Sequence, residues 1–295
     1  MKWITALLAS GAALLGINSL MGNRQLSVEQ ETVFVRSLPD NFEGLRIVLI
    51  ADLHKKKFGR DQSFLLDSVR AAKPDIIVFA GDLYSRTEHH PTDKVRFMKD
   101  LWEIAPVYYT AGNHEINDPD LFEAVCHKLK SLGINVLRNR MAVLTQGRQR
   151  LNIYGLQLPL KYYKNKDGSY RDLPEPSAGD IGRYLGTPDR HQCNLLIAHD
   201  PLFFASYEQW GADLVMSGHV HGGVIRLPFV GGLFSPERKF FPKYTKGLYR
   251  IGTSVMAVTT GLGKFRFNNP SQIMVLNLTG KKKPVKHTRG KAWEL

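Results

Sequence analysis

Short apolar segments recur along the chain, and in its first half they alternate with amphipathic segments. Runs rich in Val, Ile and Leu predict β-strands, and apolar positions three or four residues apart predict helices over 62–72 and 121–132. The predicted strands cover residues 32–35, 45–51, 75–80, 107–110, 151–154, 194–198, 214–217, 256–260 and 272–278. Because alternating strands and helices are typical of βαβ units, we expect an α/β fold with parallel strands.

The second half of the chain is richer in strands and turns. Residues 158–180 form a long polar stretch punctuated by Pro and Gly. Loops of this length inside folded domains are usually functional or mobile. We therefore expect the chain to leave the core there and to return at the strand predicted over 194–198.

Residues with metal-binding side chains stand just past the ends of five predicted strands. They are Asp52 and His54, Asp82, Asn113 and His114, His199, and His219 and His221. Open α/β sheets bind their ligands at the carboxyl ends of the strands. The sequence therefore predicts one site at this edge, built from loops that are far apart in the chain.

Each of these residues, taken alone, has a simpler explanation. A strand-terminal Asp such as Asp52 or Asp82 often caps a helix. Asn113 after a glycine fits a turn, and a lone His199 fits a packed core. Their joint occurrence at strand ends is improbable by chance. In an extended segment residues i and i+2 point the same way, so Asp52 and His54 can converge on one ion.

The two cysteines change the picture by excluding thiolate ligands. Cys126 and Cys193 match no paired-thiol metal motif, so His, Asp and Asn would have to hold any metal. Two carboxylates, one amide oxygen and four imidazoles suit two borderline divalent ions such as Mn²⁺, Fe²⁺ or Zn²⁺. Two ions bridged by a carboxylate form the clamp that enzymes use on phosphate esters. The donor set therefore favours a dinuclear hydrolytic centre.

The charge balance points to an anionic partner. The chain has 40 Lys and Arg against 27 Asp and Glu, a formal charge of +13. Residues 223–250 and 281–295 each carry a net charge of +5. The first segment mixes basic and aromatic residues, which suits anionic lipid headgroups, stacking on nucleic-acid bases or a plain structural loop. The second is typical of a solvated basic tail.

The longest apolar stretch lies at the N-terminus. After Lys2, no residue from Trp3 to Met21 is charged. About 20 apolar residues span a bilayer, and no small-residue cleavage site follows. We therefore expect residues 1–24 to be an uncleaved single-pass anchor in the cell (inner, cytoplasmic) membrane, with a buried helix as the alternative. The catalytic domain, residues 25–280, could lie on either side.

The motif set as a whole resembles a known superfamily. The ordered series Asp-x-His, Gly-Asp, Gly-Asn-His-Glu, a single His and Gly-His-x-His resembles the calcineurin-like metallophosphoesterases over about residues 44–279. Together with the N-terminal stretch, residues 218–228 resemble the bacterial membrane-anchored phosphodiesterase branch. The resemblance implies a four-layer α-β-β-α sandwich of two mixed sheets.

The resemblance also divides the candidate ligands between two divalent ions. It implies Asp52, His54 and His221 for the first ion, and Asn113, His199 and His219 for the second. Asp82 would bridge the two, with a water or hydroxide between them as nucleophile. His114 would contact the phosphate and protonate the leaving oxygen.

One position departs from the pattern of several relatives. Their Gly-Asp-x-x-Asp-Arg motif has a second Asp that orients the catalytic His, whereas this chain has Ser85 there. The group that orients His114 is therefore open. Arg86 matches the Arg of that motif, either as a contact for a phosphate oxygen or as a surface ion pair.

These observations predict a metal-dependent enzyme that hydrolyses a phosphodiester or pyrophosphate bond. An anionic, membrane-associated substrate fits the anchor, and the resemblance suggests a lipid A precursor such as UDP-2,3-diacylglucosamine. A nuclease or nucleotide phosphodiesterase is the enzymatic alternative, although the anchor does not favour nucleic acid as a partner. A non-catalytic membrane scaffold is the other alternative, and the complete ligand set argues against it.

Overall fold

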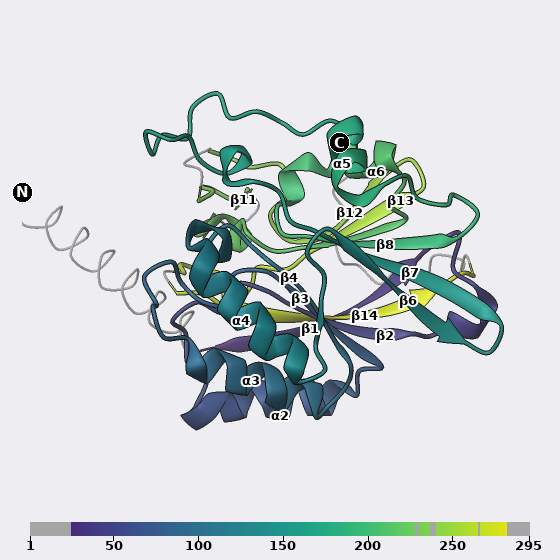
Figure 1. The fold of residues 1–295 in the computed structure, drawn as a ribbon, viewed down its shortest axis with the longest axis horizontal. Coiled ribbons are helices and arrows are strands. Elements are labelled where there is room, and N and C mark those ends of the chain that lie inside the picture. Colours follow the sequence, from purple (N-terminus) through teal and green to yellow (C-terminus); the bar gives the residue numbers. More distant parts are fainter. Residues whose placement is uncertain (1–24, 228–229, 237–239, 265, 282–295) are drawn as a thin grey trace, which may run out of the picture.

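Two six-stranded β-sheets lie face to face in the computed structural model, which describes residues 25–227, 230–236, 240–264 and 266–281 (Figure 1). The strand order of the first sheet is β1 (Leu26–Phe34), β14 (Ser271–Thr279), β2 (Arg46–Ile50), β3 (Ile76–Ala80), β4 (Val107–Thr110) and β5 (Asn135–Val136). Strands β2 to β5 are parallel, whereas β14 is antiparallel to β2. The sheet is therefore mixed.

The second sheet is also mixed. Its strand order is β12 (Gly247–Ile251), β13 (Ser254–Val258), β9 (Leu214–Ser217), β8 (Cys193–Ala198), β7 (Gln149–Leu156) and β6 (Arg140–Gln146). The four inner strands are parallel, and the two edge strands β12 and β6 are antiparallel to their neighbours. A separate small hairpin pairs β10 (Arg226–Leu227) with β11 (Gly231–Gly232).

Helices cover the outer face of each sheet. Those packed on the first sheet are α2 (Ser63–Ala72), α3 (Thr92–Trp102) and α4 (Pro119–Ser131). Those packed on the second sheet are α5 (Ala178–Leu185) and α6 (Phe204–Trp210). Short 3-10 turns are η1 (Asp40–Phe42), η2 (Arg60–Gln62), η3 (Glu115–Asn117), η4 (Leu160–Tyr162), η5 (Pro201–Phe203) and η6 (His221–Gly223). The order of layers is therefore α-β-β-α, as the family resemblance implies.

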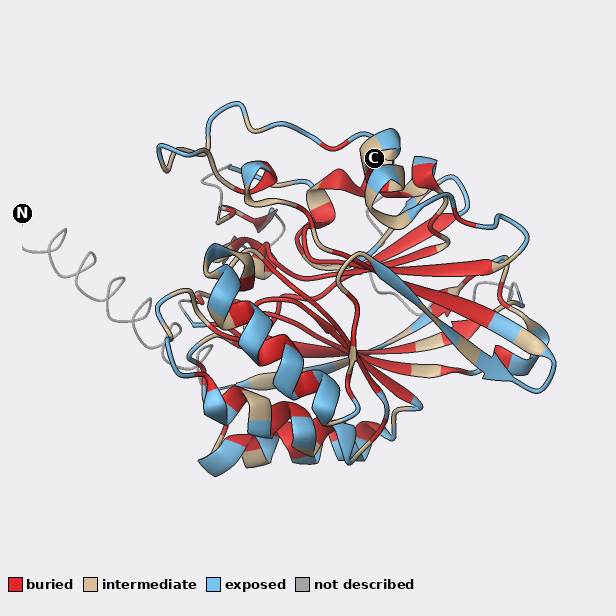
Figure 2. Cartoon of the chain, in the orientation of Figure 1, coloured by how far each residue is buried: buried red, intermediate tan, exposed pale blue. Residues whose placement is uncertain are grey.

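Burial on both faces explains why the central strands are almost wholly apolar. One core cluster fills the space between the sheets, and two others lie under the helices. Figure 2 shows the buried residues concentrated on the strands, with the exposed residues on the outer sides of the helices. Parallel strands covered on both faces are typically continuous Val, Ile and Leu runs, as in Ile76–Ala80.

All nine predicted strands and both predicted helices overlap elements of the structure. The elements that the pattern missed include α3, β6 and β12. The predicted anchor over residues 1–24 and the basic tail, apart from Lys281, lie outside the described residues. Within the part of the chain that the structure describes, no helix combines the length and apolar character needed to cross a membrane.

Candidate metal centre

The predicted site residues meet at one edge of the two sheets, where β2, β3, β4, β8 and β9 end. Ligand atoms within 4.8 Å of one another form three overlapping groups. The groups are Asp52, His54 and His221; His54, Asp82 and His114; and Asp82, His199 and His219. The loops that the sequence analysis selected therefore converge on a single site.

Asp82 lies at the centre of the site. Its Oδ2 is 3.4 Å from His199 Nε2, 3.6 Å from His54 Nε2 and 3.9 Å from His114 Nε2. Two ligands about 2.1 Å from one ion, at a tetrahedral angle, would lie ~3.4 Å apart. The first two spacings therefore match those of two ligands around a shared ion. A carboxylate in this position can serve two ions.

The backbone at the site is strained. Five candidate ligands have left-handed conformations, with φ of 57° at Asp52, 48° at His54, 55° at Asp82, 67° at His219 and 51° at His221. Such conformations are uncommon for residues other than glycine and cost about 1–3 kcal/mol each. The expectation of an extended Asp52-x-His54 segment is therefore wrong, although the two side chains do converge.

Glycines make room for the two carboxylates. A Cβ atom on Gly112 would lie 2.2 Å from Asp82 Oδ1, and a Cβ atom on Gly261 would lie 2.3 Å from Asp52 Oδ2. Any larger residue at either position would displace a candidate ligand. The sequence analysis passed over Gly261, although its Gly-Leu-Gly motif follows a predicted strand.

Several buried polar atoms at the site have no hydrogen-bond partner among the described residues. They are Asn113 Oδ1, His54 Nδ1 and His221 Nδ1. A buried polar atom without a partner costs about 1–3 kcal/mol, so native proteins rarely keep one without a reason. Imidazole nitrogens and an amide oxygen are also metal ligands. The residues present therefore fit a pair of divalent ions.

The state of the imidazoles also suits metal binding. Burial lowers the pKa of His54 to about 3 and that of His221 well below its usual range, so both rings are neutral. His199 Nδ1 donates to the Ala80 carbonyl at 2.6 Å. That hydrogen bond leaves Nε2 facing the carboxylates, and such a partner commonly orients a metal-binding histidine.

The two carboxylates differ in their electrostatics. Burial raises the pKa of Asp52 to about 6. Burial acts on Asp82 in the same direction, but the charges of His114 and His199 outweigh it and hold the pKa of Asp82 well below its usual range. Burial alone would lower the pKa of His199, but the nearby Asp82 raises it to about 10. A bound cation would take the place of that proton.

His114 is oriented by Arg86 rather than by an acidic side chain. The backbone N–H of Arg86 donates to His114 Nδ1 at 3.1 Å. The proton of the neutral ring therefore sits on Nε2, which lies 3.2 Å from Arg86 Nη2. Both groups are then donors, so this contact is not a hydrogen bond, and the two adjacent N–H groups could donate to the same anion. The Arg86 backbone N–H therefore orients His114 in this chain, in which Ser85 stands where several relatives have an Asp.

The loop that carries Arg86 is held by two charged residues that the sequence analysis missed. Glu88 Oε2 accepts from the backbone N–H of Ser85 at 2.6 Å, and Glu88 Oε1 lies 3.4 Å from Lys94 Nζ. Lys94 is only 1% exposed. Glu88 lies on a loop and Lys94 on α3, and the two residues form no recognisable sequence motif. Their contact is therefore visible only in the fold.

Glu115 ties two of the site loops together. Its carboxylate accepts from the backbone N–H groups of Asp82 (3.0 Å), Leu83 (2.5 Å) and Gly112 (2.8 Å). It is fully buried, and burial raises its pKa to about 7. The Gly-Asn-His-Glu motif contains this residue, but the sequence analysis assigned it no role.

Comparison with known proteins agrees with this geometry. The family model for calcineurin-like phosphoesterases matches residues 45–223. The chain is 26% identical to the metallophosphoesterase YkuE of Bacillus subtilis over 252 residues, which are 82% of this chain and 80% of that protein. It is 27% identical to the phosphodiesterase YaeI of Escherichia coli over 249 residues, 81% and 84% of the two chains.

Among solved structures, the phosphopantetheinyl hydrolase PptH of Mycobacterium tuberculosis is similar with a TM-score of 0.48 and 14% identity, over 74% of this chain and 91% of that one. The family model spans more than half of the chain and includes every residue of the candidate centre. The chain therefore belongs to the calcineurin-like phosphoesterase family and is a metallophosphoesterase.

Proposed function

We propose that the enzyme hydrolyses phosphodiester or pyrophosphate bonds with two divalent ions held by the candidate ligands. The observation that carries this proposal is the position of Asp82, whose Oδ2 lies 3.4–3.9 Å from imidazole nitrogens of three different loops. Bound there, two ions would supply an activated water nucleophile and neutralise charge on the phosphate. Mn²⁺, Fe²⁺ and Zn²⁺ all suit the donors.

The chain's own residues would complete the chemistry. Arg86 Nη2 and His114 Nε2 present adjacent donors, which suit two oxygens of one phosphate group. The His114 Nε2–H group would donate a hydrogen bond to the leaving oxygen and stabilise the charge that develops there. Donors placed in advance at such a position typically contribute ~10²–10³-fold to turnover.

We further propose that the substrate is a membrane-associated phosphodiester or pyrophosphate, such as UDP-2,3-diacylglucosamine. The uncharged stretch from Trp3 to Met21 and the charge of +13 support an enzyme tethered to the inner membrane that acts on anionic lipids. The similarity to a protein named phosphodiesterase supports the bond class.

A nuclease or nucleotide phosphodiesterase is the second candidate, because the same positive charge would attract nucleic acid. A non-catalytic scaffold is less well supported, since all seven candidate ligands are present at the site edge. The membrane substrate is favoured over both because it accounts for the apolar N-terminal stretch as well as for the charge.

A substrate screen tests these alternatives. The full chain supplied with Mn²⁺ would be assayed against bis(p-nitrophenyl) phosphate, p-nitrophenyl phosphate, single-stranded DNA, cyclic nucleotides and UDP-2,3-diacylglucosamine in vesicles. We expect hydrolysis of the soluble diester and faster hydrolysis of the lipid than of DNA. Preference for DNA would favour the nuclease, and inactivity on every ester would contradict the catalytic proposal.

A further inference from the structure

Exposed apolar side chains gather on one segment beside the metal centre. In the described parts of residues 227–241, the exposed fractions are 37% for Leu227, 58% for Val230, 70% for Phe240 and 60% for Phe241. We call these four residues, with Lys243, the aromatic ridge. Two consecutive phenylalanines exposed to this degree forgo the hydrophobic stabilisation that burial would give.

Specific contacts fix the position of Phe240 and Phe241 in the ridge. The Phe240 ring packs edge-on against Phe234 with centroids 5.2 Å apart, and the two residues form a β-bridge. The backbone N–H of Phe241 donates to the Leu233 carbonyl at 2.9 Å. The described part of the ridge is therefore built into the fold with its apolar side chains directed outward.

Hydrogen bonds connect the residues that hold the ridge to a loop of the metal centre. The backbone N–H of Leu233 donates to the Ile225 carbonyl (2.8 Å), and that of Phe234 donates to the Gly223 carbonyl (3.2 Å). Gly223 ends the 3-10 turn that begins at His221. The ridge therefore stands next to the site rather than on a remote surface.

The chain enters the fold at the same edge. Leu26, the first residue of β1, pairs with Ser271, and Ser271 Oγ donates to the Leu262 carbonyl at 3.1 Å. The N–H of Leu262 donates to Ala51, the residue before Asp52, at 3.0 Å. An ion pair between Glu29 and Lys246 further ties β1 to the segment that follows the ridge. The first strand of the described chain thus begins beside the metal centre.

Charge complementarity identifies the occupant of this surface. Residues 223–250 have six basic residues against one acidic residue. Lys243 is exposed, with its Nζ 5.1 Å from the Tyr244 ring centroid. Aromatic and aliphatic side chains beside cations are the composition of surfaces that enter anionic lipid interfaces. Nucleic-acid platforms use aromatic rings, whereas Leu227 and Val230 offer no face for stacking.

We infer that the aromatic ridge docks onto an anionic lipid bilayer and holds the metal centre facing the membrane surface. Phe240 and Phe241 would enter the interface, and Lys243 would contact lipid phosphates. This inference rests on the proposed function and extends it, because it places the metal centre where a phosphodiester carried by a membrane lipid could reach it. Docking itself, however, can be measured without any hydrolysis.

The test uses a fluorescent reporter on the full chain. Phe240→Cys would be labelled with an environment-sensitive nitrobenzoxadiazole dye, since both native cysteines are buried. Met141→Cys is the matched control. Met141 is 48% exposed on β6, at the opposite edge of the second sheet from β12. Both proteins would be reconstituted into phosphatidylethanolamine–phosphatidylglycerol vesicles and into phosphatidylcholine vesicles.

We expect the dye at position 240 to shift to the blue, brighten several-fold and be quenched by doxyl lipids in the anionic vesicles, with a weaker response in phosphatidylcholine. The dye at position 141 should not respond. Lys243→Glu in the Phe240→Cys background should weaken the response, because each charge near an anionic surface is worth roughly fivefold in binding.

Three outcomes would overturn docking: an unresponsive dye at position 240, an equal response in the absence of lipid that grows with protein concentration, or a response to DNA but not to vesicles. Hydrolysis of bis(p-nitrophenyl) phosphate by the same labelled proteins reports separately on the proposed function. Active protein without a lipid response would reject the docking surface alone, and inactive protein with a lipid response would reject the enzymatic proposal alone.

Discussion

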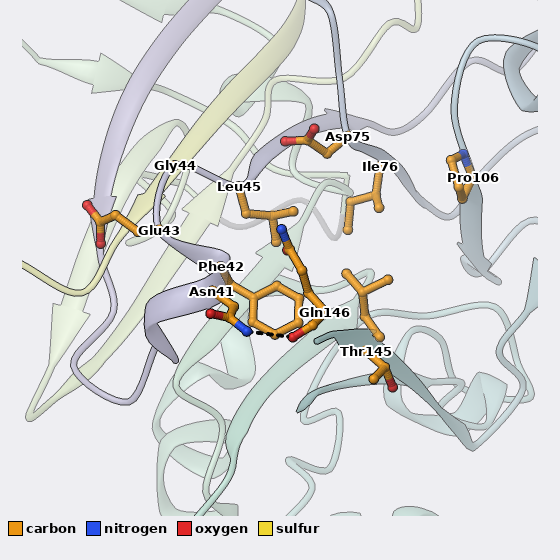
Figure 3. A pocket seen from close by; sticks show the side chains of 11 residues that line it. Asn41, Phe42, Glu43, Gly44, Leu45, Asp75, Ile76, Pro106, Thr145 and Gln146 are labelled. Atoms are coloured by element: carbon orange, nitrogen blue, oxygen red, sulfur yellow. Dashed lines mark hydrogen bonds between the residues drawn. The ribbon is translucent and has the colours of Figure 1, made fainter. Parts of the chain in front are cut away.

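The carboxyl and amino ends of the central strands differ in the backbone strain and hydrogen bonding of their polar residues. At the carboxyl edge, the candidate ligands combine strained backbone, buried carboxylates and polar atoms without partners. At the amino edge lies a cavity of about 350 Å³ between the sheets, shown in Figure 3.

The polar side chains around the amino-edge cavity serve the fold itself. Asn41 Nδ2 donates to the Gln146 carbonyl at 2.7 Å, the contact drawn in Figure 3. Asp75 accepts from the backbone N–H of Arg46 at 2.7 Å, and Glu43 accepts from that of Gly280 at 2.9 Å. The two edges therefore differ in that strained backbone and buried, unpartnered ligand atoms coincide at the carboxyl edge, and their coincidence at one place points to function.

The largest effect is expected from Asp82→Asn. Loss of the central carboxylate weakens both proposed ion sites at once, so metal content and turnover should fall together. The loss should exceed the ~10–100-fold typical of residues that only support a ligand. Metal analysis and steady-state rates would be compared with Asp75→Asn at the amino edge. A variant that keeps two ions and normal turnover would show that Asp82 is not the bridge.

His114→Ala should lower turnover by about 10²–10³-fold and leave metal content unchanged. The loss should be smaller for nitrophenyl esters, whose leaving groups need little help, than for alkyl esters. His114→Gln, which keeps a side-chain N–H donor, is the matched control and should recover part of the rate. Equal losses on both classes of ester would limit His114 to positioning the phosphate, and loss of an ion would make it a ligand.

Glu115→Ala should destabilise the fold as well as slow the reaction. Three buried N–H groups would lose their acceptor, at about 1–3 kcal/mol each. Denaturant unfolding should report this loss, and turnover should fall ~10–100-fold, as for other supporting residues of metal sites. Glu115→Gln keeps one acceptor oxygen and should lie between the two proteins. An unchanged unfolding midpoint would mean that the loops do not depend on this carboxylate.

The smallest effect is expected at the amino edge. Asn41→Ala removes an exposed hydrogen bond to Gln146 and should cost about 0.5–1.5 kcal/mol of stability without changing turnover or metal content. Thermal unfolding and the diester assay would measure both. A clear loss of activity would contradict the expectation that the amino edge has only a structural role, and would indicate that the cavity belongs to the functional site.

Much of the fold can be predicted from the sequence, because its central strands are buried on both faces. Ile76–Ala80 is a continuous apolar run, and Leu214–Ser217 is apolar except for its last residue, as is typical of strands buried on both faces. The edge strands β6 and β12 were missed; both are largely exposed or only partly buried, although β6 contains four consecutive apolar residues. Strand β1 was predicted only at its end, since Glu29, Gln30 and Glu31 fill its centre.

The part of the site that could be predicted from the sequence is its set of candidate metal ligands. Strand-end His and Asp residues identified the converging loops, because chelating side chains in that position have few structural uses. The hydrogen bond from the Arg86 amide to His114 could not be predicted, since a backbone donor leaves no trace in the sequence. The pairing of Lys94 with Glu88 was missed for a similar reason: charged residues on surface helices usually remain solvated.

Anomalous diffraction from crystals of the full chain loaded with Mn²⁺ or Zn²⁺ would locate the proposed ions directly. We expect two anomalous peaks about 3.5–4 Å apart, one on each side of the Asp82 carboxylate. One peak should contact Asp52, His54 and His221, and the other Asn113, His199 and His219. A single ion away from Asp82, or no anomalous peak among these side chains under saturating metal, would contradict the assignment of a dinuclear phosphoesterase centre.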